Sequence, residues 1–412
     1  GIQQKTAAND AVYVVDEITR QYERDGNPLS LVLLDIRKAY DRPPRAIVYR
    51  KLRDRGVPGH VLGVLQALLD FCTVEIQALA GVSEPVPVQV GVPQGDVLSP
   101  DLFNIYVDDL PRRLVRACAP FGGCPRYGGV SVPCIMYADD QTLLHWRADA
   151  LQAMLDECAR FAAENLYTYN VQKSEVCNHL RGPHATLFLA GQPLREVTAT
   201  SLLGVAVRDG LIDHAEQLRS RVEKASRAMF GLDQIGALRT ARLPLTQKAL
   251  LIAMYFRSRT EYGMAIARHP TTSLAAVDRL ITEQLTACLG GRATALTMRF
   301  CGLVPATARS ALLRWRFITR LRARSSDSSL LPSLAVRAYR AALNDSRIRL
   351  RKRTARCAFF SGLRANSERY CQQYLASVGR EPTPDALLII ERTAFFHTLR
   401  ESTWSRQDAS LK

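Results

Sequence analysis

Two adjacent carboxylates, Asp139 and Asp140, stand in the sequence YADDQT at residues 137–142. The apolar segments VPCIM and TLLHW flank them, so we expect the pair at the tip of a strand hairpin. A third acid, Asp35, ends the apolar run LSLVLLD at residues 29–35, which is typical of a strand buried on both faces. Because Asp is also a common turn residue, a solvated turn is the alternative interpretation of the pair.

These three acids can form one site if the two strands are neighbours in a sheet. Carboxylates gathered at one sheet edge raise one another's pKa and need cations to stay ionised. Two Mg²⁺ ions suit such a cluster, because Mg²⁺ prefers oxygen ligands and keeps water and phosphate in its shell. A metal pair of this kind stabilises the attacking and leaving oxygens of a phosphoryl transfer in polymerases and nucleases.

The charge balance of the chain indicates a polyanionic partner. Its 412 residues include 55 Lys and Arg against 39 Asp and Glu, a formal net charge of +16. Nucleic acid is the first candidate for the partner, and an anionic membrane surface is the second. The longest apolar stretches, such as ALLIAMYF at residues 249–256, are shorter than the roughly 20 residues that span a bilayer. We therefore expect no membrane span.

The cysteines indicate a reducing compartment. The chain has 10 cysteines, and they lack the close pairs or regular spacing of a disulfide framework or a zinc module. This usage fits an intracellular protein of the nucleus or cytoplasm.

The elements that must position the acids follow from the apolar periodicity. The first half is expected to mix helices and strands, and the part beyond about residue 211 is expected to be helical. The expected elements of the first half are helices at 7–22, 43–72 (broken by GVPG at 56–59), 98–116 and 149–165, a hairpin at 74–90, and short strands at 185–207.

Five sequence motifs surround these acids, and motif by motif the chain resembles a reverse transcriptase, most closely those of non-LTR retrotransposons. The resemblance covers residues 1–208 well and the helical remainder loosely. In chain order the motifs are LVLLDIRKAYDRPPR (31–45), GVPQGDVLSPDLFNIYVDDL (91–110), MYADD (136–140), NVQKSEV (170–176) and LFLAGQPLREVTATSLLGV (187–205).

The resemblance implies an α+β fold of the right-hand polymerase type. It would have partial fingers and a palm with an antiparallel sheet, then a helical thumb and a basic helical C-terminal extension. The expected domains are residues 1–208 for fingers and palm, 209–324 for the thumb, and 334–412 for the basic region.

The resemblance also implies catalytic roles. Asp35, Asp139 and Asp140 would hold two Mg²⁺ ions, with Mn²⁺ as a possible substitute. Asp139 is a stronger candidate for a metal ligand than Asp140, because the first Asp of the hairpin is the better established ligand in this family. Lys173 matches a lysine thought to protonate or neutralise the leaving pyrophosphate. A surface lysine is the alternative interpretation of Lys173.

Three further residues match nucleotide-binding positions of the family. Tyr40 occupies the place of an aromatic steric gate that would meet a ribonucleotide 2′-OH, with a core tyrosine as the alternative. Gln94 and Gly95 match residues packed against the incoming nucleotide and the template base.

Cations of the second half are candidates for nucleic-acid binding. They occur in a predicted helical region and in the sequence RLRKR, and the candidates are Arg314, Arg316, Arg320, Arg349, Arg351, Lys352 and Arg353. Cations that neutralise phosphates supply affinity for nucleic acid, although a solvated helix face remains the alternative.

The predicted function is extension of a primer 3′-OH with dNTPs on an RNA template. The partners would be the RNA template, a DNA primer and dNTPs, with an endonuclease on missing sequence or on a separate protein. One rival is an RNA-dependent RNA polymerase, against which Tyr40 argues. The other is an inactive or truncated nucleic-acid-binding relic, against which the acids at all three positions argue.

Overall fold

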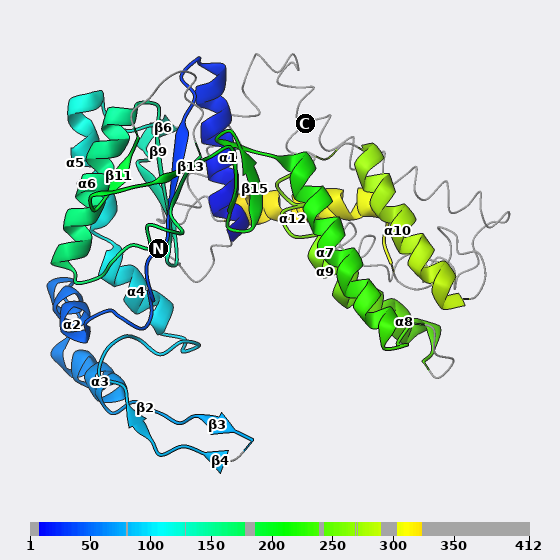
Figure 1. The fold of residues 1–412 in the computed structure, drawn as a ribbon, viewed down its shortest axis with the longest axis horizontal. Helices are drawn as coiled ribbons and strands as arrows, with labels where there is room; N and C mark the ends of the chain where they lie inside the picture. Colours follow the sequence, from blue (N-terminus) through cyan, green and yellow to red (C-terminus); the bar gives the residue numbers. More distant parts are fainter. Residues whose placement is uncertain are drawn as a thin grey trace. The chain divides into compact units, whose positions relative to one another are not determined.

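The computed structural model describes residues 8–79, 81–127, 129–177, 186–238, 243–267, 269, 271–289 and 303–323. The described residues form two compact units, and the boundary between them in the sequence lies between Ile212 and Asp213 (Figure 1). This division lies four residues beyond the predicted end of fingers and palm at residue 208. The predicted basic region at 334–412 lies outside the described residues, so its structure stays a prediction.

A five-stranded sheet forms the centre of the first unit (Figure 1). The strand that ends before Asp35 runs antiparallel to both of its neighbours, and one of them is the second strand of the hairpin with Asp139 at its tip. The condition for bringing the three acids together, that these strands are neighbours in one sheet, is therefore met. In spatial order the strands are β13 (Arg195–Val197), β10 (Glu175–Cys177), β1 (Ser30–Leu34), β9 (Asp140–His145) and β8 (Cys134–Tyr137).

Six α-helices accompany this sheet in the described part of the first unit. Helix α6 packs on β9 and on α5, and α1 contacts β8. Leu143, Leu151 and Phe161 belong to one buried core, in which each such side chain contributes about 1.5–3 kcal/mol by burial. The helices are α1 (Ala8–Arg24), α2 (Arg45–Asp54), α3 (Gly59–Asp70), α4 (Ser99–Val107), α5 (Leu110–Cys118) and α6 (Ala148–Glu164).

The segment predicted to be helical at 98–116 consists of two helices, and Asp108 and Asp109 lie at the break between them. Helix α4 ends at Val107 and α5 begins at Leu110, with Pro111 in its first turn. Proline is favoured in the first turn and disfavoured in a helix interior, since it lacks the N–H that an interior position donates. The helical spacing predicted for this segment is therefore confirmed.

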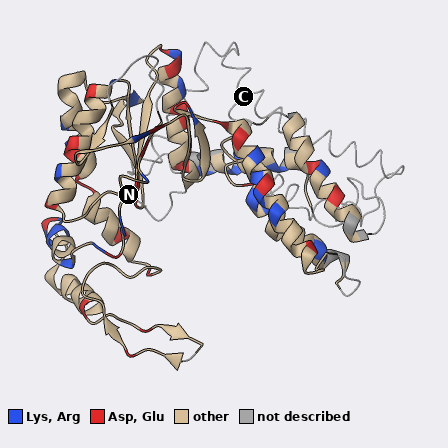
Figure 2. Ribbon diagram, viewed as in Figure 1, with Lys and Arg blue, Asp and Glu red and all other residues tan. Residues whose placement is uncertain are grey.

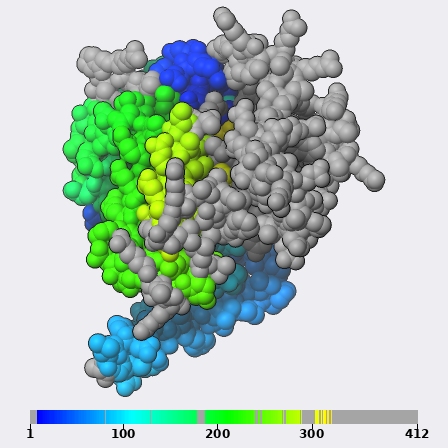
Figure 3. Space-filling model, turned by 90° about the vertical axis from the view of Figure 1, so that its right-hand side faces the viewer, coloured from blue at the N-terminus to red at the C-terminus, as the bar shows by residue number. Residues whose placement is uncertain are grey.

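Short ribbons and turns complete the first unit. The predicted hairpin at 74–90 is a ribbon of four short strands that stands away from the sheet (Figures 1 and 3). Its strands are β2 (Thr73–Val74), β3 (Gln77–Ala78), β4 (Gly81–Val82) and β5 (Val86–Pro87), and the other short elements are η1 (Ala119–Phe121), β6 (Arg126–Tyr127), β7 (Val130–Ser131), β11 (Phe188–Leu189), β12 (Gln192–Pro193), β14 (Ala199–Leu202), β15 (Val205–Arg208) and β16 (Leu211–Ile212).

The second unit is helical over its described residues, as predicted. Asp213 begins its first helix by accepting a hydrogen bond from the Glu216 N–H at 2.9 Å, which satisfies one N–H of the first turn. Its core includes Ile252, Phe256 and Leu285. The helices are α7 (His214–Gln234), α8 (Leu245–Ile252), the π-helix η2 (Ala253–Arg257), α9 (Ser258–Thr260), α10 (Thr271–Leu289) and α12 (Ala306–Ala323). Among the described residues, none of the helices has the length and apolar character to cross a membrane.

A backbone contact ties the loop after β1 to the segment before α4. The Val92 N–H donates to the Tyr40 carbonyl at 2.8 Å, and the Gly91 N–H donates to the Pro43 carbonyl at 3.0 Å. Gly91 has φ +81°, and a Cβ placed there would lie 2.6 Å from the carbonyl oxygens of both Tyr40 and Asp41. Only glycine therefore permits this close approach.

The substitution Gly91→Ala should lower the free energy of unfolding by about 2–4 kcal/mol, because backbone strain and a clash with carbonyl oxygens act together. Gly95→Ala is the matched control, since Gly95 also has positive φ (+90°) but a Cβ added to it would have no other atom within 4 Å. Its cost should be only about 1 kcal/mol, from the backbone conformation alone. Urea unfolding followed by circular dichroism measures the free energy of unfolding of both variants. Equal losses would show that the close approach of Gly91 to the carbonyl oxygens does not contribute to stability.

Candidate active site

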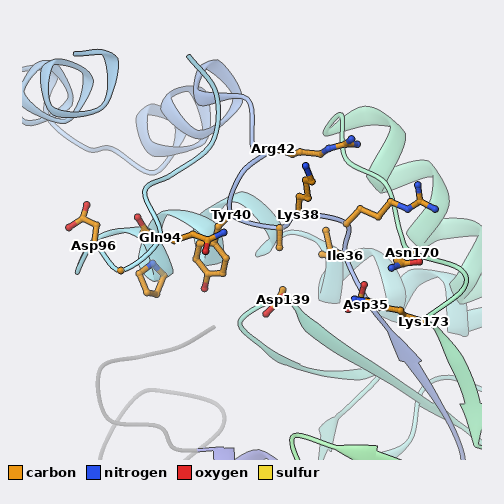
Figure 4. Close-up of a pocket in the computed structure, with 15 residues that line it drawn as sticks. Asp35, Ile36, Lys38, Tyr40, Arg42, Gln94, Asp96, Asp139, Asn170 and Lys173 are labelled. Carbon is orange, nitrogen blue, oxygen red and sulfur yellow. The ribbon is translucent and has the colours of Figure 1, made fainter. Parts of the chain in front are cut away.

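A pocket of about 780 Å³ lies where the carboxyl end of β1, the β8–β9 hairpin tip, the turn before α4 and the segment after α6 meet (Figure 4). These segments are far apart in the sequence, and the sheet brings them together. The predicted site residues that line the pocket are Asp35, Tyr40, Gln94, Gly95, Asp139 and Lys173. Asp140 is not among the residues of its wall.

Strand register places Asp35 opposite Asp140. The β1–β9 ladder ends with the pair of Leu34 and Gln141. The next pair in this antiparallel register is Asp35 and Asp140. The other side of Asp35 is held by the segment after α6. There the Asn170 N–H donates to the Asp35 carbonyl at 2.8 Å, and the Asp35 N–H donates to Ser174 Oγ at 3.2 Å.

The hairpin tip is a tight turn with a strained residue. Tyr137 pairs with Asp140, which leaves Ala138 and Asp139 as the two turn residues. Ala138 has φ 53°, in the left-handed region, and this conformation costs a non-glycine residue about 1–2 kcal/mol. Strain of this kind persists where the surrounding structure imposes it, often at functional sites. Here it presents Asp139 at the tip, in the wall of the pocket (Figure 4).

Two of the acids, Asp35 and Asp139, act on the pKa of the third. The pKa of Asp140 is raised above its usual value, first by loss of solvent around the carboxyl and then by the charges of Asp139 and Asp35. Three acids whose charges interact in this way form a local excess of negative charge, which a bound cation would neutralise.

The donor chemistry of the site fits a divalent metal ion. Carboxylate oxygens are the ligands that Mg²⁺ and similar hard ions prefer, and Asp35 and Asp139 line the same cavity. Within the ranges that the structure describes, no three His, Cys, Asp or Glu side chains form a group ready to hold a metal ion. The assignment of Asp35, Asp139 and Asp140 as metal ligands therefore stays a prediction.

Tyr40 forms part of the pocket wall between the loop after β1 and α4. Its ring stacks on the buried ring of Phe103, with centroids 5.2 Å apart and planes inclined by 27°. The pKa of Tyr40 is raised, first by burial and then by the charges of Asp139 and Tyr137. Tyr40 is half-buried rather than fully buried, so it differs from a core tyrosine and presents a surface to the cavity.

The turn that carries Gln94 and Gly95 is held from two sides. Gln94 Nε2 donates to Asp41 Oδ1 at 2.9 Å, and Ser99 Oγ donates to the Pro93 carbonyl at 2.5 Å. Gly95 adopts φ +90°, which glycine does without steric cost. The turn thereby stays attached to the loop that holds Tyr40.

Lys173 lies on the segment after α6, beside the strand end that carries Asp35. Its backbone N–H donates to the Asn170 carbonyl at 3.0 Å, and Figure 4 shows Lys173 and Asn170 near Asp35. The residue is exposed and lines the pocket. It therefore has the position that the motif predicts, and its catalytic role stays a prediction.

The pocket wall also contains polar residues that were not predicted as site residues from the sequence, among them Arg37, Lys38, Arg42, Ser99 and Asn170. The three cations stand close to Asp35 in the sequence DIRKAYDR, so their proximity to this acid could have been noted from the sequence. Asn170 belongs to the motif NVQKSEV, and its N–H holds the Asp35 carbonyl.

The predicted nucleic-acid-binding cations have different surroundings. Arg314 donates a hydrogen bond to the Ala267 carbonyl, and Arg320 lies over the Phe317 ring at 5.3 Å from its centroid, so both contact their own unit. Arg316 is exposed. The remaining candidates, which lie outside the described residues, are Arg349, Arg351, Lys352 and Arg353.

Helix α7 carries a group of cations that were not predicted from the sequence (Figure 2). Arg221 stacks over the Tyr262 ring at 4.2 Å, and Arg219 pairs with Glu216. Lys224 and Arg227 follow on the same helix, and both are exposed.

Comparisons with known proteins identify the family of the chain. Residues 1–207 match the family described as "Reverse transcriptase (RNA-dependent DNA polymerase)". The chain is 26% identical over 253 residues to the "Retrovirus-related Pol polyprotein from type-2 retrotransposable element R2DM" of Drosophila melanogaster, covering 57% of this chain and 23% of that protein. It is 24% identical over 280 residues to the "Probable RNA-directed DNA polymerase from transposon X-element" of the same organism, covering 67% of this chain and 30% of that protein.

The chain thus spans less than a third of either relative. A telomerase structure from Candida albicans, solved in complex with a fragment of telomeric RNA, aligns at a TM-score of 0.36 and 11% identity, over 80% of this chain and 54% of that chain. That score is too low to support an argument. The match over half of the sequence, with Asp35, Asp139 and Tyr40 in one pocket, shows that the chain belongs to the reverse transcriptase family, and its relatives are those of non-LTR retrotransposons.

Proposed function

We propose that this chain is the polymerase core of a non-LTR retrotransposon reverse transcriptase. It would extend a primer 3′-OH with dNTPs on an RNA template. The observation that carries the proposal is the pocket, in whose wall Asp35, Asp139, Tyr40, Gln94 and Lys173 come together. Each of these residues stands at its position in a reverse transcriptase motif, so the geometry and the family point to the same chemistry.

The metal in this proposal is a pair of Mg²⁺ ions, with Mn²⁺ as a substitute. Asp35, Asp139 and Asp140 would hold them. Reverse transcriptases as a family use divalent metal ions, and bound ions of this kind stabilise the attacking and leaving oxygens of a phosphoryl transfer. The mutual effect of the three acids on the pKa of Asp140 supports a cation at this place.

The protein's own residues would position the reactants, which supplies most of the rate in phosphoryl transfer. The Tyr40 ring, supported by Phe103, would meet the sugar and exclude a 2′-OH. Gln94 and Gly95 would contact the nucleotide and the template base. Lys173 would place a cation beside the pyrophosphate as negative charge develops there.

The partners in this proposal are the RNA template, a DNA primer and dNTPs. We assign fingers and palm to residues 1–208, a thumb to residues 209–324, and nucleic-acid binding to the basic region 334–412. The exposed cations Lys224 and Arg227 of α7 support a role of the second unit in binding the phosphates of the nucleic-acid backbone. An endonuclease would be supplied elsewhere in a longer polyprotein or by another protein. The site of action would be the nucleus or the cytoplasm.

The double substitution Asp139→Ala, Asp140→Ala should lower primer extension on poly(rA) with dTTP and Mg²⁺ by at least about 10²–10³-fold, because charge stabilisation of the transition state is lost. Glu75→Ala, Glu84→Ala removes the same charge from exposed positions of the β2–β5 ribbon and should leave the rate unchanged. Full extension by the Asp variant would refute the site. If the unsubstituted chain extends no primer but binds it in a salt-dependent way, the chain is a nucleic-acid-binding protein instead.

The substitution Tyr40→Ala should reduce the preference for dTTP over UTP by roughly tenfold to a hundredfold, because removal of the ring opens space for a 2′-OH. Tyr40→Phe keeps the ring and its stacking on Phe103, so it should keep the preference. Single-nucleotide incorporation with each substrate measures the ratio. An unsubstituted chain that uses UTP as readily as dTTP would favour the RNA-dependent RNA polymerase instead.

A further inference from the structure

One polar side chain is buried directly after the acids of the hairpin. Gln141 follows Asp140 in β9 and is only 1% exposed. Its partners across the sheet are Leu34 in β1 and Met136 in β8, and residues paired in this way lie on one face of the sheet. Leu34 belongs to the apolar core of the first unit, and Met136 packs against it. An amide among these apolar side chains is unfavourable unless its hydrogen bonds are made.

The Gln141 amide is the end of a chain of buried hydrogen bonds. The Tyr169 hydroxyl donates to Gln141 Oε1 at 2.8 Å, and the hydroxyls of Tyr169 and Tyr167 share a hydrogen bond at 3.1 Å. A hydroxyl has one proton to donate, so Tyr167 is the donor in the second bond. Both tyrosines are buried, and their rings meet edge to face with centroids 5.4 Å apart. The network therefore connects β9 to the segment after α6.

Tyr169 lies next to the contacts that hold Asp35. It forms an antiparallel bridge with Ile36, and the N–H of the following residue, Asn170, donates to the Asp35 carbonyl at 2.8 Å. The backbone of Asp35 thus lies between β9 on one side and the segment after α6 on the other. The hydrogen bond between Gln141 and Tyr169 is a side-chain link between those two neighbours of Asp35.

This link lowers the stability of the core in which it lies. Gln141 Nε2 is buried and has no hydrogen-bond partner among the residues that the structure describes. A buried donor without a partner loses its hydration and gains nothing in return. A leucine of similar size would avoid that loss, so stability does not explain the amide. What distinguishes the amide from a leucine is that its hydrogen bond fixes a distance and a direction, whereas apolar contact is non-directional.

We propose that Gln141 and Tyr169 are positioning residues that set the separation of Asp35 from Asp139 and Asp140. This inference rests on the proposed function, because phosphoryl transfer requires the acids at a fixed separation. Neither Gln141 nor Tyr169 is among the residues that line the pocket. They act through the backbones of β9 and of the segment after α6. Loss of the link should therefore lower kcat for primer extension and leave the KM for dTTP unchanged.

The test compares a network variant of the whole chain with a control of the same kind. Gln141→Leu, Tyr167→Phe, Tyr169→Phe replaces all three polar groups of the network. Tyr106→Phe, the control, removes a hydroxyl of the same core that donates to the Asn165 carbonyl. The network variant should lower kcat by roughly tenfold to a hundredfold, because small misplacements of reacting groups have effects of that size. Its KM for dTTP should stay that of the unsubstituted chain.

Stability distinguishes positioning from a purely structural role. Apolar replacement of all partners of a buried network is neutral or stabilising, so the midpoint of urea unfolding should stay unchanged or rise in the network variant. Tyr106→Phe leaves a buried carbonyl without its donor, so it should lower the midpoint and keep kcat. An unchanged kcat in the network variant overturns the proposal. A kcat that falls together with the midpoint also overturns it, because loss of folded protein would account for the effect.

Amide hydrogen exchange tests the network without any reaction. The N–H groups of Asn170 and Asp35 donate to the Asp35 carbonyl and to Ser174 Oγ, and such bonds protect amides from exchange. In the network variant, peptides that contain these two amides should exchange at least about tenfold faster than in the unsubstituted chain, and in Tyr106→Phe at an equal rate. If the unsubstituted chain extends no primer, the proposed function fails. The exchange rates still decide whether the network holds Asp35, and equal rates in the network variant would refute it.

Discussion

The register of β1 between β9 and β10 is the constraint on which the site depends. Side chains alternate between the two faces of a strand, so a shift by one residue would move Asp35 to the opposite face. The ladder that pairs Leu34 with Gln141 is what brings Asp35 opposite Asp140. On the other side, hydrogen bonds from Asn170 and to Ser174 hold the backbone of Asp35. The same segment carries Lys173, so one strand end positions acids and a cation together.

Strained backbone accompanies this arrangement at several points. Ala138 and Lys38 both lie in the left-handed region, and Gly91 permits a close approach that no other residue could make. The strain is offset by packing elsewhere in the unit, where α6 packs on β9 and α5 packs on α6 with buried side chains. The result is a cavity whose wall contains both acids and cations.

The sequence predicted the elements of the first unit closely, because their apolar patterns are regular. The run LSLVLLD is β1, the segments beside YADD are β8 and β9, and the predicted helical half is helical where it is described. Membership of the reverse transcriptase family confirms the predicted right-hand polymerase fold class. The segment predicted to be helical at 98–116 is helical, and it contains two helices because the chain breaks at Asp108 and Asp109 before Pro111.

The sequence by itself determined the family, because five motifs stand in a fixed order along the chain, and the same motifs led to the prediction of Asp35, Asp139 and Asp140 as the site acids. It did not determine which cations share the cavity with those acids, since Arg37, Lys38 and Arg42 resemble ordinary surface charges in a chain of net charge +16. Nor did it show that Arg314 and Arg320 contact their own unit. Only tertiary structure decides such matters, because the direction of a side chain depends on backbone turns and strand register that residue type does not specify.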